Sequence, residues 1–90
     1  MSLNFPNVSR NYDADHRRIR FWGHDDALEV PFFLEEGALF RLDPKTKNME
    51  TAMLGTFDAA VDRIHGVASR LYGHGKRSFY VLTASDFDHA

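Results

Sequence analysis

The residues of this sequence that could bind a metal are its five histidines, His16, His24, His65, His74 and His89. A helical zinc site needs two histidines at positions i and i+4, and no two of these have that spacing. The nearest approaches to ligand clusters are His24-Asp25-Asp26 and Asp86-x-Asp88-His89. Both lie in segments whose polar residues are typical of turns and chain ends. We therefore predict no metal site and no cofactor.

Groups that could perform catalysis are present but are not arranged for it. The serines at 9, 69, 78 and 85 lack the flanking glycines of a nucleophile elbow. The neighbouring carboxylates Asp25 and Asp26, like Glu35 and Glu36, point apart on a strand or helix, because adjacent residues face different sides. Isolated glycines form no phosphate-binding loop. We name no catalytic residue, and the sequence favours a non-enzymatic role.

One segment, residues 17–22, combines basic and aromatic side chains. Arg18, Arg20 and Trp22 occupy alternate positions, so a regular strand would place them on one face. Such a face can contact phosphates while stacking bases, as single-stranded nucleic-acid-binding proteins do. The arginines can equally keep a strand edge soluble and pair with Glu29 across a sheet, without any ligand.

Length and composition bound these alternatives. Ninety residues with 43% hydrophobic side chains predict one domain with one small core. The absence of cysteine excludes a disulfide framework, a thiolate zinc site and a cysteine nucleophile. A net charge of −2 provides no general attraction to nucleic acid. No stretch approaches the roughly 18 apolar residues of a membrane span, and the polar N-terminal segment does not resemble a signal peptide. We expect a cytoplasmic protein.

The first half of the chain predicts strands and turns. Apolar and polar residues alternate in three segments, residues 3–5, 17–22 and 27–33. A polar loop is expected over residues 8–16 and a hairpin turn of about four residues over 23–26. Pro31 lacks a backbone N–H, so the strand that contains it is expected to lie at an edge or to be short.

The second half predicts two helices and a last strand. Helical spacing from Leu34 to Leu42 predicts a short helix, which Gly37 weakens. Residues 56–72 predict one long helix with Thr56 as its N-cap, because they form a single apolar stripe at Phe57, Val61, Ile64, Ala68 and Leu71. Residues 78–83 predict a buried strand, and residues 84–90 a flexible acidic tail.

These elements predict a single α+β domain over residues 1–90. Its antiparallel sheet of about four strands, in the order β-β-β-α-α-β, has the short helix and the long amphipathic helix packed on one face. The opposite face would then retain Trp22, Phe33 and either Phe79 or Tyr80. Either loops cover these side chains, or they remain exposed for a partner, because a contiguous apolar patch on a small protein usually marks an interface.

Several phrases of the sequence occur in an order that resembles the domain-of-unknown-function family 1488. They are Leu3-Asn4-Phe5-Pro6, Arg18-Ile19-Arg20-Phe21, residues 33–39, the stripe Phe57, Ile64, Ala68, Tyr72, and residues 80–87. The chain departs from the family pattern at Gly37 and Val61. The resemblance, which spans nearly the whole chain, implies an α+β fold and a bacterial, cytoplasmic setting. The family brings no established biochemistry.

We therefore expect a non-enzymatic interaction or regulatory module, with Arg18, Arg20, Trp22 and Phe33 as its interaction surface. Its partner would be a second copy of the chain or another protein, and no membrane. The first alternative is a weak single-stranded nucleic-acid-binding protein that uses residues 17–22. The second is a small-molecule-binding protein or enzyme whose site forms between chains.

Overall fold

Two antiparallel strands form the centre of the structure, a computed structural model that describes residues 3–6, 9–75 and 77–88. Strand β3 spans Arg18–Asp25 and β4 spans Leu28–Glu35, and they pair along their whole length. Ile19 and Phe21 of β3 are buried, whereas the residues that alternate with them, Arg18, Arg20 and Trp22, face the other side of the sheet. The alternation expected for residues 17–22 is therefore confirmed, without a bulge.

The hairpin turn is shorter than the expected four residues. It consists of Asp26 and Ala27, and Asp26 has a φ of 56°, a left-handed conformation that aspartate tolerates. Gly23, expected in the turn, lies inside β3 opposite Val30. A Cβ atom at Gly23 would lie 2.8 Å from Leu3 Cδ1. Glycine here allows the N-terminal segment to pack against the strand.

Two short strands share the outer edge of β3. Strand β1, Leu3–Asn4, pairs with its end, and β2, Arg10–Asp13, pairs with its beginning. The prediction of a loop over residues 8–16 is thus wrong for β2. This strand is polar and carries no apolar alternation, but Tyr12 packs against the core and Arg10 bonds to Asp58, with both nitrogen–oxygen distances 2.8 Å. Tertiary contacts override the local preference for a loop.

The fifth strand, β5 (Tyr80–Leu82), completes the sheet in the order β1-β3-β4-β5, with β2 beside β3. It runs parallel to β4, so the sheet is mostly rather than wholly antiparallel. Pairing covers only Phe32–Leu34 of β4. The expectation that the strand with Pro31 lies at an edge or is short is wrong, because β4 has eight residues and lies between β3 and β5. Pro31 is accommodated because it lies just outside the segment paired with β5, where β4 has an open edge.

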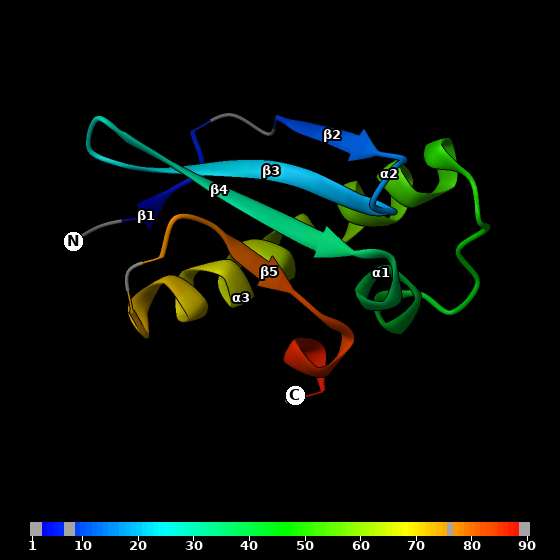
Figure 1. Cartoon of the computed structure of the whole chain (residues 1–90). Coiled ribbons are helices and arrows are strands. Elements are labelled where there is room, and N and C mark those ends of the chain that lie inside the picture. The colour runs from blue at the N-terminus through cyan, green and yellow to red at the C-terminus, as the bar shows by residue number, and fades with distance from the viewer. Residues whose placement is uncertain (1–2, 7–8, 76, 89–90) are drawn as a thin grey trace.

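Three helices connect β4 to β5 and lie on one side of the sheet (Figure 1). They are α1 (Glu36–Leu42), α2 (Glu50–Ala59) and α3 (Val61–Gly73). The single long helix predicted over residues 56–72 is wrong. Its apolar stripe continues through a break at Ala60, where φ is −113° and ψ is 18°, and Thr56 lies inside α2 instead of capping a helix.

The segment expected to be a flexible tail begins with a 3-10 helix, η1 (Ala84–Phe87). The Asp86 carboxylate accepts a hydrogen bond from the Thr83 backbone N–H at 2.8 Å, which forms a capping box. Phe87 is 3% exposed and packs into the core. The last residues, 89–90, lie outside the described part of the chain.

The sheet and helices enclose one core. Its buried members come from β3, β4, all three helices, β5 and η1. The radius of gyration is 12.4 Å, against about 12 Å expected for a folded chain of this length. The observed architecture is the α+β fold predicted from the sequence. Within the described ranges, no helix has the length and apolar character to cross a membrane.

We predict that Ile64 of α3 contributes a large share of the core stability. It is completely buried at the centre of the apolar stripe. Ile64→Ala should lower the free energy of unfolding by about 2–5 kcal/mol, because the deletion leaves a cavity. Urea denaturation followed by circular dichroism measures this change. A loss below about 0.5 kcal/mol would show that Ile64 is not essential to the packing.

Candidate functional site

The four residues expected to form an interaction surface lie together on the sheet face opposite the helices, which we call the open face. The ladder sets Arg20 opposite Phe33, with Arg18 and Trp22 two positions away on β3. None of the four is fully buried. Helices α1, α2 and α3 all contribute buried residues to the other side, so none of them covers this face (Figure 1).

Both arginines of the open face lie over aromatic rings. The Arg18 guanidinium carbon is 3.8 Å from the centroid of the Phe33 ring, and that of Arg20 is 4.9 Å from Trp22. Arg18 is also 3.6 Å from the Asp13 carboxylate. Arg20 is exposed and has no ion pair among the described residues. Its charge is the less neutralised of the two.

Apolar side chains occupy the middle of the open face. Phe33 contacts Phe79 edge to face, with the ring centroids 5.7 Å apart. Phe79 is 50% exposed, whereas Tyr80 is buried, which resolves the alternative that the sequence left open. Val81 lies opposite Phe33 and Pro31 lies opposite Trp22. Sequence reasoning did not assign Val81 and Pro31 to the interaction surface.

Two shallow hollows flank this apolar centre. The first, of about 350 Å³, is lined by Ser9, Trp22, His24 and Glu29. The second, of about 300 Å³, is lined by Arg77, Ser78, Phe79 and Val81. Glu29 was expected to pair with an arginine of the strand, but it lies opposite His24, and Arg18 lies opposite Glu35. The first hollow therefore presents an exposed carboxylate beside an indole ring.

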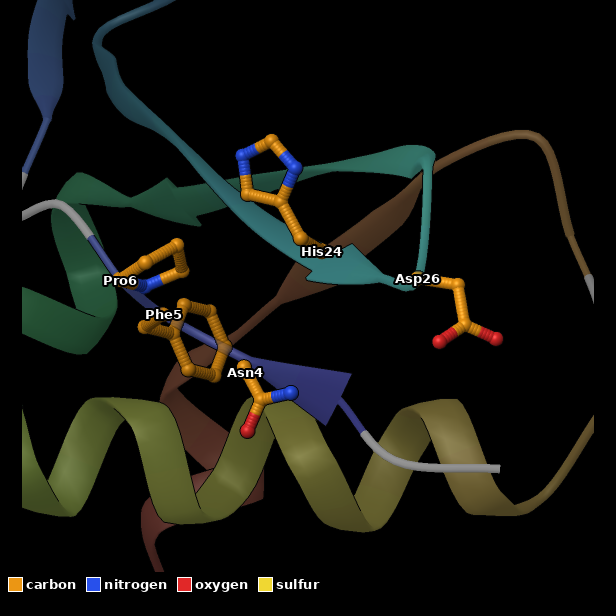
Figure 2. Close-up of a pocket in the computed structure, with 5 residues that line it drawn as sticks. All are labelled: Asn4, Phe5, Pro6, His24 and Asp26. Atoms are coloured by element: carbon orange, nitrogen blue, oxygen red, sulfur yellow. The ribbon is translucent and has the colours of Figure 1, made fainter.

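The cluster His24-Asp25-Asp26 does not converge on one point. Figure 2 shows the His24 imidazole on the side of β3 away from α3, in an open hollow of about 590 Å³ that Asn4, Phe5, Pro6 and Asp26 also line. Asp25 instead accepts a hydrogen bond of 2.5 Å from the Tyr72 hydroxyl of α3. The three side chains therefore do not surround a common ligand position.

The most chemically distinctive contact outside the open face is this pairing of Tyr72 with Asp25. The hydrogen bond to Asp25 raises the pKa of Tyr72 to about 12. Tyr72 consequently remains protonated at neutral pH and is a poor general base. The adjoining cavity of about 210 Å³ is lined partly by Val30 and Tyr80. The hydrogen bond between Tyr72 and Asp25 therefore favours a structural role for these two residues.

His65 of α3 holds the N-terminal segment against the helix layer. Its imidazole stacks on the Phe5 ring with 3.8 Å between centroids and an angle of 6°. Burial lowers the pKa of His65, and the nearby Asp62 carboxylate offsets part of this effect. The contact therefore favours the neutral imidazole.

The fold and the open face define a class of protein: a small α+β domain whose helices lie on one side of a mostly antiparallel sheet. The chain belongs to the family described as Protein of unknown function (DUF1488), whose model matches residues 3–83. The family resemblance inferred from the sequence is thus confirmed. No curated protein and no solved structure matches the chain. The family description states no activity.

We predict that acid weakens the contact between His65 and Phe5. Because the pKa of His65 is lowered on folding, the unfolded chain takes up the proton more readily. The stability that neutral His65 contributes is fully present above the ordinary histidine pKa of about 6.5. It is lost as the pH falls through the lower pKa that His65 has in the folded protein. Urea midpoints at about pH 7.5 and about pH 5 should show a larger loss for the wild type than for His65→Phe. Equal losses would contradict this role.

We also predict that no metal ion stabilises the fold. Within residues 3–6, 9–75 and 77–88, no three histidine or carboxylate side chains are close enough to hold one. His89 lies outside these ranges. Treatment with a chelator should leave the melting temperature unchanged. A decrease that zinc or another divalent ion reverses would show that a site exists.

Proposed function

We propose that this protein is a non-enzymatic interaction module that binds another protein chain through the open face. The observation that carries the proposal is the cluster of partly exposed apolar side chains at its centre, Trp22, Pro31, Phe33, Phe79 and Val81. Charged residues surround this centre. An apolar centre with a polar rim is the usual anatomy of a protein interface.

Charge favours a protein over nucleic acid as the partner. The strands β2, β3 and β4 contribute two arginines to the open face, and they also contribute three carboxylates, Asp13, Glu29 and Glu35. Arg18 already lies near one of these carboxylates. A phosphate backbone would therefore meet repulsion as well as attraction.

Single-stranded nucleic acid remains the second candidate, because both arginines are stacked on aromatic rings of an open sheet. Arginines and aromatics on such a sheet can bind bases by stacking. The dependence of affinity on salt concentration distinguishes a nucleic-acid partner from a protein partner. Affinity for an oligonucleotide falls steeply as salt increases, whereas binding at an apolar protein interface depends on salt much less.

The proposed setting is the bacterial cytoplasm. The family resemblance and the absence of cysteine support this setting. The proposed role does not require catalysis, a cofactor or a membrane.

We predict that Trp22→Ala strongly weakens partner binding while the chain remains folded. Trp22 lies on the open face away from the core, and large aromatic residues often dominate the energy of an interface. The affinity for a purified partner should fall by at least roughly 30-fold. Because Trp22 is the only tryptophan, binding should also shift the fluorescence emission of the wild type to shorter wavelength.

The experiment begins with capture from nuclease-treated bacterial lysate and ends with binding measured between purified proteins. Leu28→Ala is the matched control. Leu28 is 61% exposed, but its position on β4 places it on the helix side of the sheet and not on the open face. This variant should bind as the wild type does. The proposal is wrong if Trp22→Ala binds the purified partner equally well, or if this variant unfolds because Trp22 supports the core.

A further inference from the structure

Three charged residues of β3 and β4 on the open face have no ion pair within the described chain: Arg20, Glu29 and Glu35. Glu29 is the carboxylate that lies across the apolar centre from Arg20. Both side chains are exposed. Trp22 of β3 lies opposite Pro31 of β4, and this pair lies between the two charges. Arg20 is two residues from Trp22 on β3, towards one end of the ladder. Glu29 is two residues from Pro31 on β4, towards the other end. The two charges therefore flank a central apolar pair at equal spacing along the strands.

The hollow beside Glu29 has the chemistry of an arginine-binding site. It is lined by Ser9, Trp22, His24 and Glu29, and it measures about 350 Å³. A guanidinium group entering it could donate hydrogen bonds to the Glu29 carboxylate and pack on the indole ring. The same sheet face thus carries both an exposed arginine and a site that fits one.

We infer that the occupant of the open face is a second copy of this chain, bound so that Arg20 of each copy enters the Glu29 hollow of the other. This inference rests on the proposed function and names its partner. A two-fold axis that runs across the strands, through the point between Trp22 and Pro31, brings Arg20 of each copy to Glu29 of the other. Such symmetry makes each contact occur twice, which is how an isologous dimer is built.

The ladder geometry is compatible with this exchange. With about 3.3 Å per residue along a strand and about 4.8 Å between strands, the line from Arg20 to Glu29 is inclined by about 20° to the strands. The two-fold axis then sets the strands of the two sheets about 40° from antiparallel, close to the roughly 30° of aligned sheet packing.

The size of the face sets the expected strength. Strands of eight residues and a width of four strands give a face of about 25 Å by 15 Å. This flat area of about 375 Å² is less than half of the roughly 800 Å² that each partner buries in an interface of standard size. We therefore expect a weak dimer that forms at high micromolar concentrations.

Charge reversal tests the inference directly. Analytical ultracentrifugation of the wild type over a range of concentrations should show the mass rising from one chain to two. Arg20→Glu and Glu29→Arg, each made alone, should weaken dimerisation at least roughly tenfold by opposing like charges. The double variant, which restores opposite charges with the original net charge, should recover the affinity of the wild type to within about threefold.

Lys47→Glu is the matched control for Arg20→Glu, because it makes the same charge change on the exposed connection between α1 and α2. It should leave dimerisation unchanged, and thermal melts should show every variant folded. The inference is overturned if the wild type remains a monomer at about 1 mM, if the single reversals have no effect, or if the double variant does not recover. Trp22-dependent binding of a different protein by a monomer would overturn this inference and leave the proposed function intact.

Discussion

The pairing of β3 with β4 in a single register is the constraint on which both faces of this protein depend. It aligns Phe21 with Phe32 on the helix side and Trp22 with Pro31 on the open side. A shift of one residue would exchange the two sets, because side chains alternate along a strand. Burial of the phenylalanine rings, whose centroids are 5.3 Å apart, therefore also fixes which residues remain available for a partner.

The parts of the fold that the sequence predicted are those determined by local pattern. Alternation identified β3 and β4 and the faces of their residues, and helical spacing identified α1 and the apolar stripe shared by α2 and α3. The break at Ala60 has no proline or glycine next to it to mark it, and the stripe continues across it. Strand β2 was missed because its contacts are not local: Tyr12 packs against the core, and Arg10 bonds to Asp58, 48 residues later in the chain.

The residues of the candidate site also fall into two groups, those that local spacing predicts and those that tertiary packing places. Arg18, Arg20 and Trp22 lie on one strand, so their shared face followed from spacing alone. Phe79 and Val81 reach the open face through the parallel register of β5 on β4, which depends on the packing of the three intervening helices. The hollow at Glu29 likewise requires the exact β3–β4 register, which the shorter turn at Asp26 and Ala27 determines. No local sequence pattern predicts either the position of Phe79 and Val81 or the hollow at Glu29.

The parallel position of β5 has a consequence for the order in which the protein is assembled. The β3–β4 hairpin closes through a two-residue turn and can form early, because little chain entropy is lost. Tyr80 can reach Phe32 only after the 47 residues that separate them have been synthesised and have packed as helices. Until then, the edge of β4 at Phe32–Leu34 lacks its neighbouring strand. A nascent chain therefore has an unpaired apolar edge, open to misassociation, until β5 has been synthesised and has docked.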